Sequence, residues 1–358
     1  MVLPLVGLFA ACSGDDGAPA SSPGGSGGAH AGAGGTASAG RGGSSAGSGG
    51  SSAGSGGSSA GAGSGGANAG SGGSSAGSGG SGAGTSDAGT GDGAPQRDSG
   101  TSDAEDPSDP RVRNCLAKPS RCGFPDDTNT GVPPGTSLSV MTGDTSFDTD
   151  GMVIEGKDIR GCVTINAKNV TIRRSKITCG WAFAVRSEGG GLLIEDSEVT
   201  CDGTTATGIV GHGFTVRRTN VHGCENGFDP SDDTTIEDNW IHDLTVTAES
   251  HTDGIQVGQG VGPLTIRHNT FALTKATNAA IIMWDEADPQ NHDVAVTHNL
   301  FDGGGWTIYC SRRRATNIVV TDNRFGVGRY GPASSCSTDT ITEWAHNIFD
   351  ATGEAVPP

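Results

Sequence analysis

The sequence lacks several features, and each absence excludes a class of protein. No run of residues approaches the ~18 apolar residues that a membrane-spanning helix needs, so we expect no such helix. Lys and Arg number 22 against 40 Asp and Glu, a net charge of −18. This charge argues against nucleic acid as a partner, because nucleic-acid binders carry a basic face. None of the nine cysteines forms a CxxC pair, which argues against a zinc site.

The first third of the chain is dominated by three small residues. Residues 13–110 consist mainly of Gly, Ser and Ala, with repeated GGSSAGS units. Such a composition cannot bury enough apolar surface to offset the entropy of the chain, so we expect a disordered linker. A Gly/Ser coil of this length has an r.m.s. span of about 50–60 Å. The folded part is therefore expected from residue 111 onward.

The stretch before this linker is short and apolar. Residues 1–12 end in LFAAC, which resembles the lipobox of bacterial lipoproteins, with Phe9 where a smaller aliphatic residue is usual. The resemblance implies that Cys12 becomes a lipidated N-terminus after cleavage, so that the lipid alone would contact a membrane. No positively charged segment precedes the apolar stretch, so a start upstream of Met1, or an incidental Cys12, remains the alternative.

Nine copies of a short phrase organise the chain between residues 152 and 349. Clear copies read VTIRRSKI, LLIEDSEV, FTVRRTNV and LTIRHNTF, and their alternating apolar and polar residues are typical of half-buried strands. A repeat of roughly 20–30 residues predicts a solenoid whose neighbouring copies share a core, here a parallel β-helix with one coil per copy. The central apolar residues of the copies are Ile154, Ile172, Ile194, Val216, Ile236, Ile266, Val296, Val320 and Trp344.

Equivalent positions of stacked coils should form rows of side chains, because neighbouring strands lie ~4.8 Å apart. The two positions after each anchor alternate in sign, which favours this register since opposite charges attract across strands. These rows read Arg173, Glu195, Arg217, Glu237, Arg267 and Arg174, Asp196, Arg218, Asp238, His268. The next row ends in Asn239, Asn269, Asn299, Asn323 and Asn347. We interpret this asparagine row as a structural ladder rather than a rail that binds a ligand.

The cysteines other than Cys12 support the same coil map. Four of them lie seven or eight residues after consecutive anchors and form a column whose coil spacing suits a disulfide. Four disulfides would indicate an oxidising compartment. We expect residues 111–135, which hold the first pair, to cap the open end of the solenoid. The expected pairs are Cys115–Cys122, Cys162–Cys179, Cys201–Cys224 and Cys310–Cys336.

Two coils between Ile236 and Val296 are longer than the rest and carry the candidate functional site. Each holds roughly eight to ten extra residues, and such insertions on one side of a solenoid usually build its binding face. Polar and aromatic residues concentrate in and beside them. The candidate catalytic residues are His251, Asp253, Asp229, Tyr309 and Arg312. The candidate substrate-binding residues are Gln256, Trp284, Asp285, Lys275, Arg313 and Arg314.

The expected stacking of coils places the carboxyl groups of this set beside other polar side chains. Aligning the two Gly-containing segments makes Asp229 a neighbour of Gln256, and Asn226 a neighbour of Asp253. A carboxyl group in a cleft can have its pKa raised and act as a general acid or base, while His251 titrates near neutrality. The structural alternative is that Asp253 forms a turn before a strand and that His251 is a solvated loop residue.

We expect no cofactor and a monomeric protein. Asp229, Asp232 and Asp233 could offer carboxylate oxygens to Ca²⁺. An acidic turn that contains Pro230 and Ser231, however, is more often a solvated loop. Calcium therefore stays an alternative, and the partner that we expect is a polysaccharide or another extracellular glycan.

The repeats over residues 136–350 resemble the right-handed parallel β-helix proteins of the pectate-lyase-like superfamily. The resemblance implies an all-β, right-handed parallel β-helix of about nine coils, with a short tail at residues 351–358. That superfamily contains extracellular polysaccharide lyases, hydrolases and epimerases as well as non-catalytic adhesins. Gly211-His212-Gly213 and Thr252-Asp253-Gly254 are similar to two polygalacturonase motifs. They occur in the reverse order and without the paired-Asp or RIK motif, so we transfer no hydrolase roles; the arginine motif of pectate lyases is also missing.

The sequence leaves three functional hypotheses. The first is a polysaccharide lyase that cleaves a uronic-acid-containing chain by β-elimination, with Arg312 or Arg313 neutralising charge and His251 or Tyr309 abstracting the proton. The second is a non-catalytic surface protein that binds glycans, which the acidic charge fits better. The third is a glycoside hydrolase, which needs two carboxyl groups about 5–9.5 Å apart, such as Asp229 with Asp253.

Overall fold

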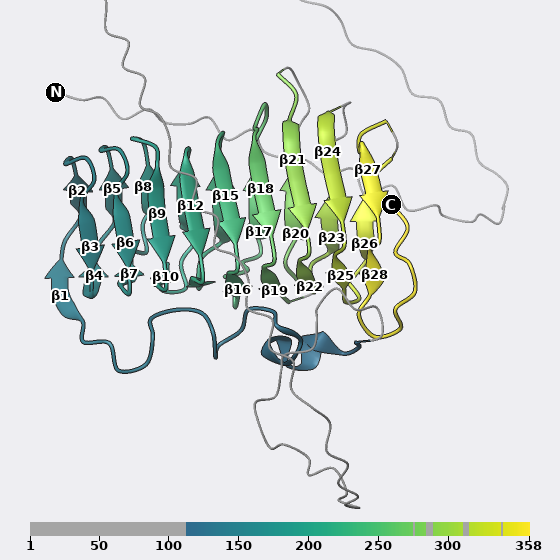
Figure 1. The fold of residues 1–358 in the computed structure, drawn as a ribbon, viewed down its shortest axis with the longest axis horizontal. Helices are drawn as coiled ribbons and strands as arrows, with labels where there is room; N and C mark the ends of the chain where they lie inside the picture. The colour runs from purple at the N-terminus through teal and green to yellow at the C-terminus, as the bar shows by residue number, and fades with distance from the viewer. Residues whose placement is uncertain (1–111, 275, 284–288, 311–314, 338) are drawn as a thin grey trace, which may run out of the picture. The chain divides into compact units, whose positions relative to one another are not determined.

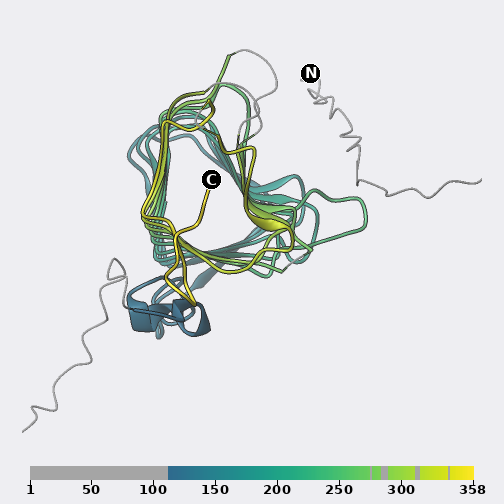
Figure 2. The ribbon, with the colours of Figure 1, turned by 90° about the vertical axis from the view of Figure 1, so that its right-hand side faces the viewer.

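Short segments rich in Val, Ile and Thr, separated by tight turns, form parallel strands that wind into a solenoid (Figure 1). The computed structural model describes residues 112–274, 276–283, 289–310, 315–337 and 339–358. Cys12 and the Gly/Ser-rich segment lie outside these ranges. Viewed along its axis, the described domain is a ring of three sheets around one core (Figure 2).

The strands of each sheet come from successive coils. Sheet A contains β1 (Ser139–Thr142), β4 (Lys157–Arg160), β7 (Lys176–Thr178), β10 (Glu198–Thr200), β13 (Asn220–His222), β16 (Trp240–His242), β19 (Thr270–Ala272), β22 (Leu300–Asp302), β25 (Arg324–Phe325) and β28 (Ile348–Phe349). Sheet B contains β2 (Thr145–Phe147), β5 (Val163–Ile165), β8 (Phe183–Ser187), β11 (Thr207–Gly211), β14 (Asn226–Pro230), β17 (Asp253–Val257), β20 (Ala279–Met283), β23 (Trp306–Tyr309) and β26 (Gly331–Ser334). Sheet C contains β3 (Val153–Glu155), β6 (Thr171–Arg173), β9 (Leu192–Glu195), β12 (Phe214–Arg217), β15 (Thr234–Glu237), β18 (Leu264–Arg267), β21 (His292–Thr297), β24 (Thr316–Thr321) and β27 (Glu343–Ala345).

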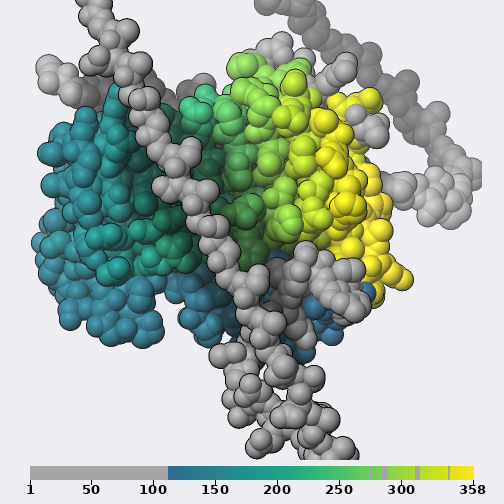
Figure 3. Space-filling view, in the orientation of Figure 1, coloured from purple at the N-terminus to yellow at the C-terminus, as the bar shows by residue number. Residues whose placement is uncertain are grey.

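The register of sheet C confirms the coil map read from the sequence. Ile154 pairs with Ile172, and Ile172 pairs with Ile194. The row continues through every predicted anchor to Trp344. Each copy of the repeated phrase holds two strands, one in sheet C and one in sheet A. In the space-filling view the successive coils pack directly against one another (Figure 3).

A single left-handed residue makes the corner between the two strands of each phrase. Gly156 takes this conformation in the first coil, with φ 62°. The second charged row of the sequence occupies the same position in later coils, from Arg174 at 47° to Asp322 at 60°. Non-glycine residues take this conformation at a cost of roughly 1 kcal/mol each. The corner is therefore set by the fold and not by local preference.

The asparagine row is a buried structural ladder, as predicted. Asn269 is fully buried and donates from Nδ2 to Asn299 Oδ1 at 3.0 Å and to the Ile236 carbonyl at 2.8 Å. Its Oδ1 accepts the backbone N–H of Asn239 at 2.9 Å. The same contacts recur in the next two coils. Each side chain thus pairs backbone groups that the corner would otherwise leave buried and unpaired.

The charged rows also form the predicted ion pairs. Arg217 contacts Glu195 at 2.8 Å, and Arg267 contacts Glu237 at 2.8 Å, each across one coil spacing. In the neighbouring row His268 Nδ1 lies 2.7 Å from Asp238 Oδ1. These arginine side chains remain 37% and 51% exposed, so each pair contributes little on its own.

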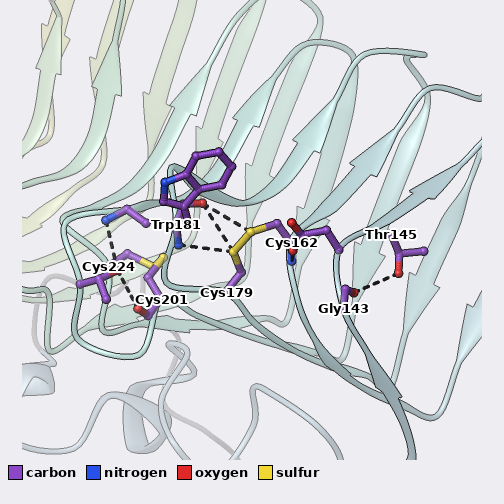
Figure 4. Close-up of a disulfide and its surroundings, with 10 residues drawn as sticks. Gly143, Thr145, Cys162, Cys179, Trp181, Cys201 and Cys224 are labelled. Carbon is purple, nitrogen blue, oxygen red and sulfur yellow. Dashed lines mark hydrogen bonds between the residues drawn. A yellow bond between two sulfur atoms is a disulfide. The ribbon is translucent and has the colours of Figure 1, made fainter. Parts of the chain in front are cut away.

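All four predicted disulfides are present. They join Cys115 to Cys122, Cys162 to Cys179, Cys201 to Cys224, and Cys310 to Cys336. Figure 4 shows the second and third of these at neighbouring points of the same corner. Four disulfides indicate an oxidising, extracytoplasmic environment. Within the described ranges, no helix has the length and apolar character needed to span a bilayer.

The sequence predicts that the segment ahead of the coils caps the open end of the solenoid. In the structure this segment does not cover the end of the first coil. Its two short helices, η1 (Cys115–Ala117) and η2 (Pro119–Cys122), pack beneath the last coils, and the segment then runs back along sheet A (Figure 1). Apolar contacts with Leu300 hold it there. Phe124, two residues after this disulfide, stacks on His268 with ring centres 5.1 Å apart, so the segment docks on the side of the solenoid and not on its end.

A buried ion pair fixes the start of this segment. Arg324 and Asp350 are 2% and 1% exposed, and their charged groups lie 3.5 Å apart. Arg324 also donates to the Val112 carbonyl at 2.9 Å, while Asp350 accepts the backbone N–H of Leu116 at 3.1 Å. At the same end of the solenoid, the C-terminal residues turn in over the core (Figure 2), and Val356 is 3% exposed.

Candidate functional site

The described parts of the insertions in the two long coils lie before the sheet B strands β17 and β20 and before the sheet C strand β21. Residues 243–252 and 273–278 connect strands of sheet A to strands of sheet B. Residues 284–291, of which 284–288 are not described, lead from sheet B to sheet C. The outer face of sheet B is therefore the surface between them, and it carries most of the described candidate residues.

Glycines at equivalent positions of two neighbouring coils, Gly227 and Gly254, alter the alternation of side chains on this face. Gly227 and Phe228 both point into the core: a Cβ on Gly227 would lie 3.2 Å from Ile241 Cγ2, and Phe228 is fully buried. Two consecutive inward residues interrupt the alternation of the strand. As a result Asn226 and Asp229, three residues apart, both lie on the outer side. The same interruption occurs in the adjoining coil, where a Cβ on Gly254 would lie 2.8 Å from Cδ1 of the buried Phe271.

Polar side chains from β14 and β17 meet on this face. Asn226 Oδ1 accepts the backbone N–H of Asp253 at 2.8 Å, and its Nδ2 donates to Gln256 Oε1 at 2.7 Å. Phe228 pairs with Ile255, so Asp229 is directly opposite Gln256. The two neighbour relations predicted from the aligned segments are therefore confirmed.

Asp229 is an exposed carboxyl group with an altered acidity. Its residue surface is open to solvent, yet the protein packed around the carboxyl group displaces enough water to raise its pKa to about 6. No other cause contributes to the shift. At pH 7 the group is mostly ionised, but it is a much stronger base than an ordinary aspartate.

Asp253 lies behind the surface. It is 1% exposed, and its Oδ1 accepts a hydrogen bond from Asn278 Nδ2 at 2.9 Å. Burial raises its pKa to about 8, and the charge of Glu225 adds to the shift. Asp253 is therefore neutral at pH 7. Because its side chain is covered, it is better placed to hold a proton near the face than to contact a large substrate.

Glu225 belongs to the site and was missed in the sequence. The residue is half-buried, and burial raises its pKa even though the backbone N–H of His251 donates a hydrogen bond to it. It follows directly from the electrostatic contact that Glu225 and Asp253 form a pair in which ionising one group opposes ionising the other. Its position directly before Asn226 in the aligned row was the signal that could have identified it.

The remaining candidates do not all converge on Asp229. Gln256 pairs with Ile282 and Ile282 with Tyr309, so Tyr309 lies three strands from Asp229, roughly 14 Å along the axis. His251 is exposed at the corner before β17. The other candidates, Lys275, Trp284, Asp285, Arg312, Arg313 and Arg314, lie outside the described residues.

The acidic turn after β14 offers no metal site. Asp232 Oδ1 accepts the backbone N–H of Gly262 at 3.0 Å, which assigns it to the corner between sheets B and C. Across the described residues, no group of three or more His, Cys, Asp or Glu side chains could hold a metal ion. The calcium alternative raised by Asp229, Asp232 and Asp233 therefore gains no support here.

Comparison with known proteins identifies the fold. A family model described as the right-handed β-helix region matches residues 146–301. Together with the three sheets of parallel strands, this match identifies the described domain as a right-handed parallel β-helix. No curated protein and no solved structure gives a match. The match supports a pectate-lyase-like, glycan-active type of fold.

Proposed function

We propose that this protein is an extracellular enzyme that cleaves a polysaccharide on the outer face of sheet B, with Asp229 as its catalytic base. The observation that carries the proposal is the exposed Asp229 carboxyl group, whose pKa is raised to about 6. A base of this acidity is ionised at neutral pH and still accepts a proton readily. The four disulfides support an extracytoplasmic location.

Hydrolysis is the reaction that the described carboxyl groups support best. Asp229 would take one proton from a water molecule as the water oxygen bonds to the anomeric carbon. The glycosidic carbon–oxygen bond breaks, and the leaving oxygen takes a proton from the pair formed by Glu225 and Asp253. Burial raises the pKa of Asp253 to about 8, so this carboxyl group retains a proton at neutral pH, and burial also raises the pKa of Glu225. Glu225 is the half-buried member and would deliver it.

The spacing between Glu225 and Asp229 favours inversion at the anomeric carbon. Glu225 and Asp229 are four residues apart, which is at most ~13 Å between Cα atoms in an extended strand. Glu225 lies directly before β14, and the interruption at Gly227 shortens its span to Asp229. Inverting enzymes hold their carboxyl groups about 6.5–9.5 Å apart to admit a water molecule, whereas retaining enzymes need about 5–5.5 Å.

β-Elimination is the second candidate function. The outward row of sheet B carries Gln256 and, two strands further, Tyr309. An amide that donates to a uronate carboxylate and a phenol that exchanges a proton are groups this reaction uses. Arg312–Arg314, outside the described residues, follow in the sequence and would neutralise the uronate charge.

Product analysis distinguishes these functions. The full-length protein is incubated with uronate-containing and neutral polysaccharides, and the products are separated by mass spectrometry. Hydrolysis adds the mass of one water per cleavage, whereas elimination yields an unsaturated uronate that absorbs ultraviolet light. Asp229→Asn should abolish either product. Asp202→Asn is the matched control because Asp202 is exposed and, among the described residues, forms a hydrogen bond only through its backbone N–H. Binding without any product would instead support a non-catalytic glycan-binding protein.

The location of the enzyme can be tested separately. We propose that a lipid on Cys12 holds the protein at the cell surface through the Gly/Ser-rich segment. Cys12→Ser should then move the protein from the membrane fraction to the soluble fraction while leaving its cleavage activity unchanged. An unchanged distribution after this substitution would contradict the lipid anchor.

A further inference from the structure

Trp181 is a large aromatic side chain that the fold leaves outside. It is 76% exposed, although an indole gains more than most side chains from burial. Its backbone is nevertheless held in place: the Phe183 N–H donates to the Trp181 carbonyl at 2.7 Å, and Cys179, two residues earlier, is in a disulfide with Cys162. Figure 4 shows the indole beside this disulfide. The ring is therefore presented on a rigid corner and not on a loose loop.

Tyr330 occupies the corresponding corner near the other end of the solenoid. It is 60% exposed, and its ring lies 6.0 Å from the Trp306 ring and 5.0 Å from the Arg329 guanidinium carbon. Within the described residues, Trp181 and Tyr330 are the two aromatic side chains with a largely exposed surface. Both stand just ahead of a strand of sheet B, at the corner where the chain leaves sheet A.

The register places Asp229 between these two rings. From β8, which follows Trp181, β14 is the second strand along sheet B, and β26, which follows Tyr330, is the sixth. The whole span is roughly 29 Å at ~4.8 Å per strand. The outward row from Arg186 through Val210 reaches Asp229 directly. From Asp229 the row continues through Gln256, Ile282 and Tyr309 to Ser334 in β26. One continuous face therefore links both aromatic corners to the carboxyl group.

We propose that a polysaccharide chain lies along the solenoid axis across sheet B, that Trp181 and Tyr330 each stack on a sugar ring, and that the chain is cut internally between them. This inference rests on the proposed function. The apolar face of a pyranose ring matches the flat face of an indole or a phenol. A span of this length is filled by an oligosaccharide and not by one or two sugars. Rings on both sides of Asp229 bind chain on both sides of the cut.

Binding measured without turnover tests the proposal. The full-length chain carrying Asp229→Asn is titrated with short and long oligomers of galacturonate and of β-1,4-linked glucose. Adding Trp181→Ala or Tyr330→Ala should weaken binding of the long oligomers roughly three- to ten-fold and leave the short oligomers unchanged. Trp181→Phe, which keeps an aromatic face, should restore most of the affinity. Val140→Ala is the matched control, because Val140 is 58% exposed on the first coil in sheet A.

The outcomes separate this inference from the proposed function. Long-oligomer affinities that do not change in the Trp181→Ala and Tyr330→Ala variants overturn the aromatic subsites, even if Asp229→Asn abolishes cleavage. Affinity that depends on both rings while Asp229→Asn still cleaves supports the subsites and overturns the base. Failure to bind any oligomer overturns both. Internal cutting also predicts that the viscosity of a long polysaccharide falls well before reducing ends accumulate; the opposite order would contradict it.

Discussion

The outer faces of sheets A and B shift the pKa of carboxyl groups in opposite directions. On sheet A, Glu198 lies 2.8 Å from Lys176 Nζ and 3.1 Å from His222 Nε2, and these partners lower its pKa to about 2. On sheet B, burial alone raises the pKa of Asp229 to about 6. The backbone is the same kind of parallel ladder in both sheets. The side chains of the next coils, therefore, decide whether a carboxyl group is neutralised or kept reactive.

This difference shows how a solenoid separates stability from chemistry. Where each charge finds its partner one coil away, as at Arg217 and Glu195, the repeat supports itself. Where the repeat is interrupted, at Gly227 and at the long coils, side chains three residues apart share one surface. The following changes test this contrast, from the largest expected effect to the smallest.

The two carboxyl groups should differ most in catalysis. Asp229→Asn removes the proposed base and should lower kcat by roughly 10²–10⁴-fold, the usual contribution of general acid–base catalysis. Glu198→Gln should leave kcat within about two-fold, because Glu198 lies on another sheet. Initial rates on the cleaved polysaccharide measure both. Equal losses in the two variants would mean that sheet B has no special role.

The asparagine ladder should be the most sensitive structural feature. Asn269→Ala removes the acceptor for the Asn239 N–H and the donor to the Ile236 carbonyl, leaving both buried groups unpaired. We expect the free energy of unfolding to fall by about 2–4 kcal/mol in urea titrations. Asn166→Ala is the control, since Asn166 is exposed and its side chain, within the described ranges, forms a hydrogen bond only with Asp148. Similar losses would argue against the ladder as a stabilising element.

Removing one disulfide between neighbouring coils should lower the free energy of unfolding by about as much as Asn269→Ala, or by somewhat less. Cys201 and Cys224 close a loop with a sequence separation of 23 residues, for which chain entropy predicts roughly 3 kcal/mol. The variant carrying Cys201→Ser and Cys224→Ser should therefore unfold at a lower urea concentration than the wild type and still bind the polysaccharide. A matching loss for the Cys115–Cys122 pair, which closes only a short loop, would contradict this entropic account.

The pH dependence of stability should have opposite signs on the two sheets. The folded-state pKa of Glu198 is lowered from 4.5 to about 2, so its contribution is present above pH ~4.5 and is lost as pH falls toward 2. Glu198→Gln should cost about 1–3 kcal/mol at pH 7. The pKa of Asp229 is raised from 3.8 to about 6, so its ionisation opposes folding as pH rises through that range.

The Asp229→Asn variant should consequently be slightly more stable than the wild type at pH 7 and equal to it at pH ~3.5. The gain should stay below about 1 kcal/mol, because the group is exposed and solvent screens it. Cleavage by the wild type should fall as pH drops below about 6, where Asp229 becomes protonated. Urea titrations and rates measured from pH 4 to 8 check both signs; a rate that rises on acidification would assign Asp229 the role of acid.

The exposed ion pairs should matter least. Arg267 is 51% exposed and contacts Glu237 at 2.8 Å. Arg267→Ala should lower the free energy of unfolding by less than about 1 kcal/mol, and high salt should remove most of the difference. A loss as large as that of Asn269→Ala would mean that the charged row, and not the asparagine row, holds the coils in register.

Features that repeat were predictable from the sequence, because stacking copies the same contacts. The anchor row from Ile154 to Trp344, the asparagine ladder and the four disulfides all follow from aligning equivalent positions. Features that break the repeat were harder to predict. The lateral path of residues 112–136 depends on contacts with Leu300 and Asp350, nearly two hundred residues away or more, and no local pattern encodes them.

The same distinction holds for the candidate site: neighbour relations that follow the repeat were predictable, and burial was not. Alignment correctly paired Asp229 with Gln256 and Asn226 with Asp253. It did not reveal that Asp253 is covered by the neighbouring corner, since burial depends on Asn278 in the next coil. It also missed Glu225, because this residue comes directly before the aligned segment and its raised pKa depends on burial in the folded chain.

The clamp formed by Arg324 and Asp350 on Val112 and Leu116 has a mechanical consequence. A pull applied to the chain upstream of Val112 would act on the last coils and not on the first. The buried charges would have to separate before any rung could be peeled from the stack, and separating a buried pair is strongly opposed. Under load the molecule would thus resist at its far end, leaving the carboxyl-bearing rungs β14 and β17 undisturbed until the clamp gives way.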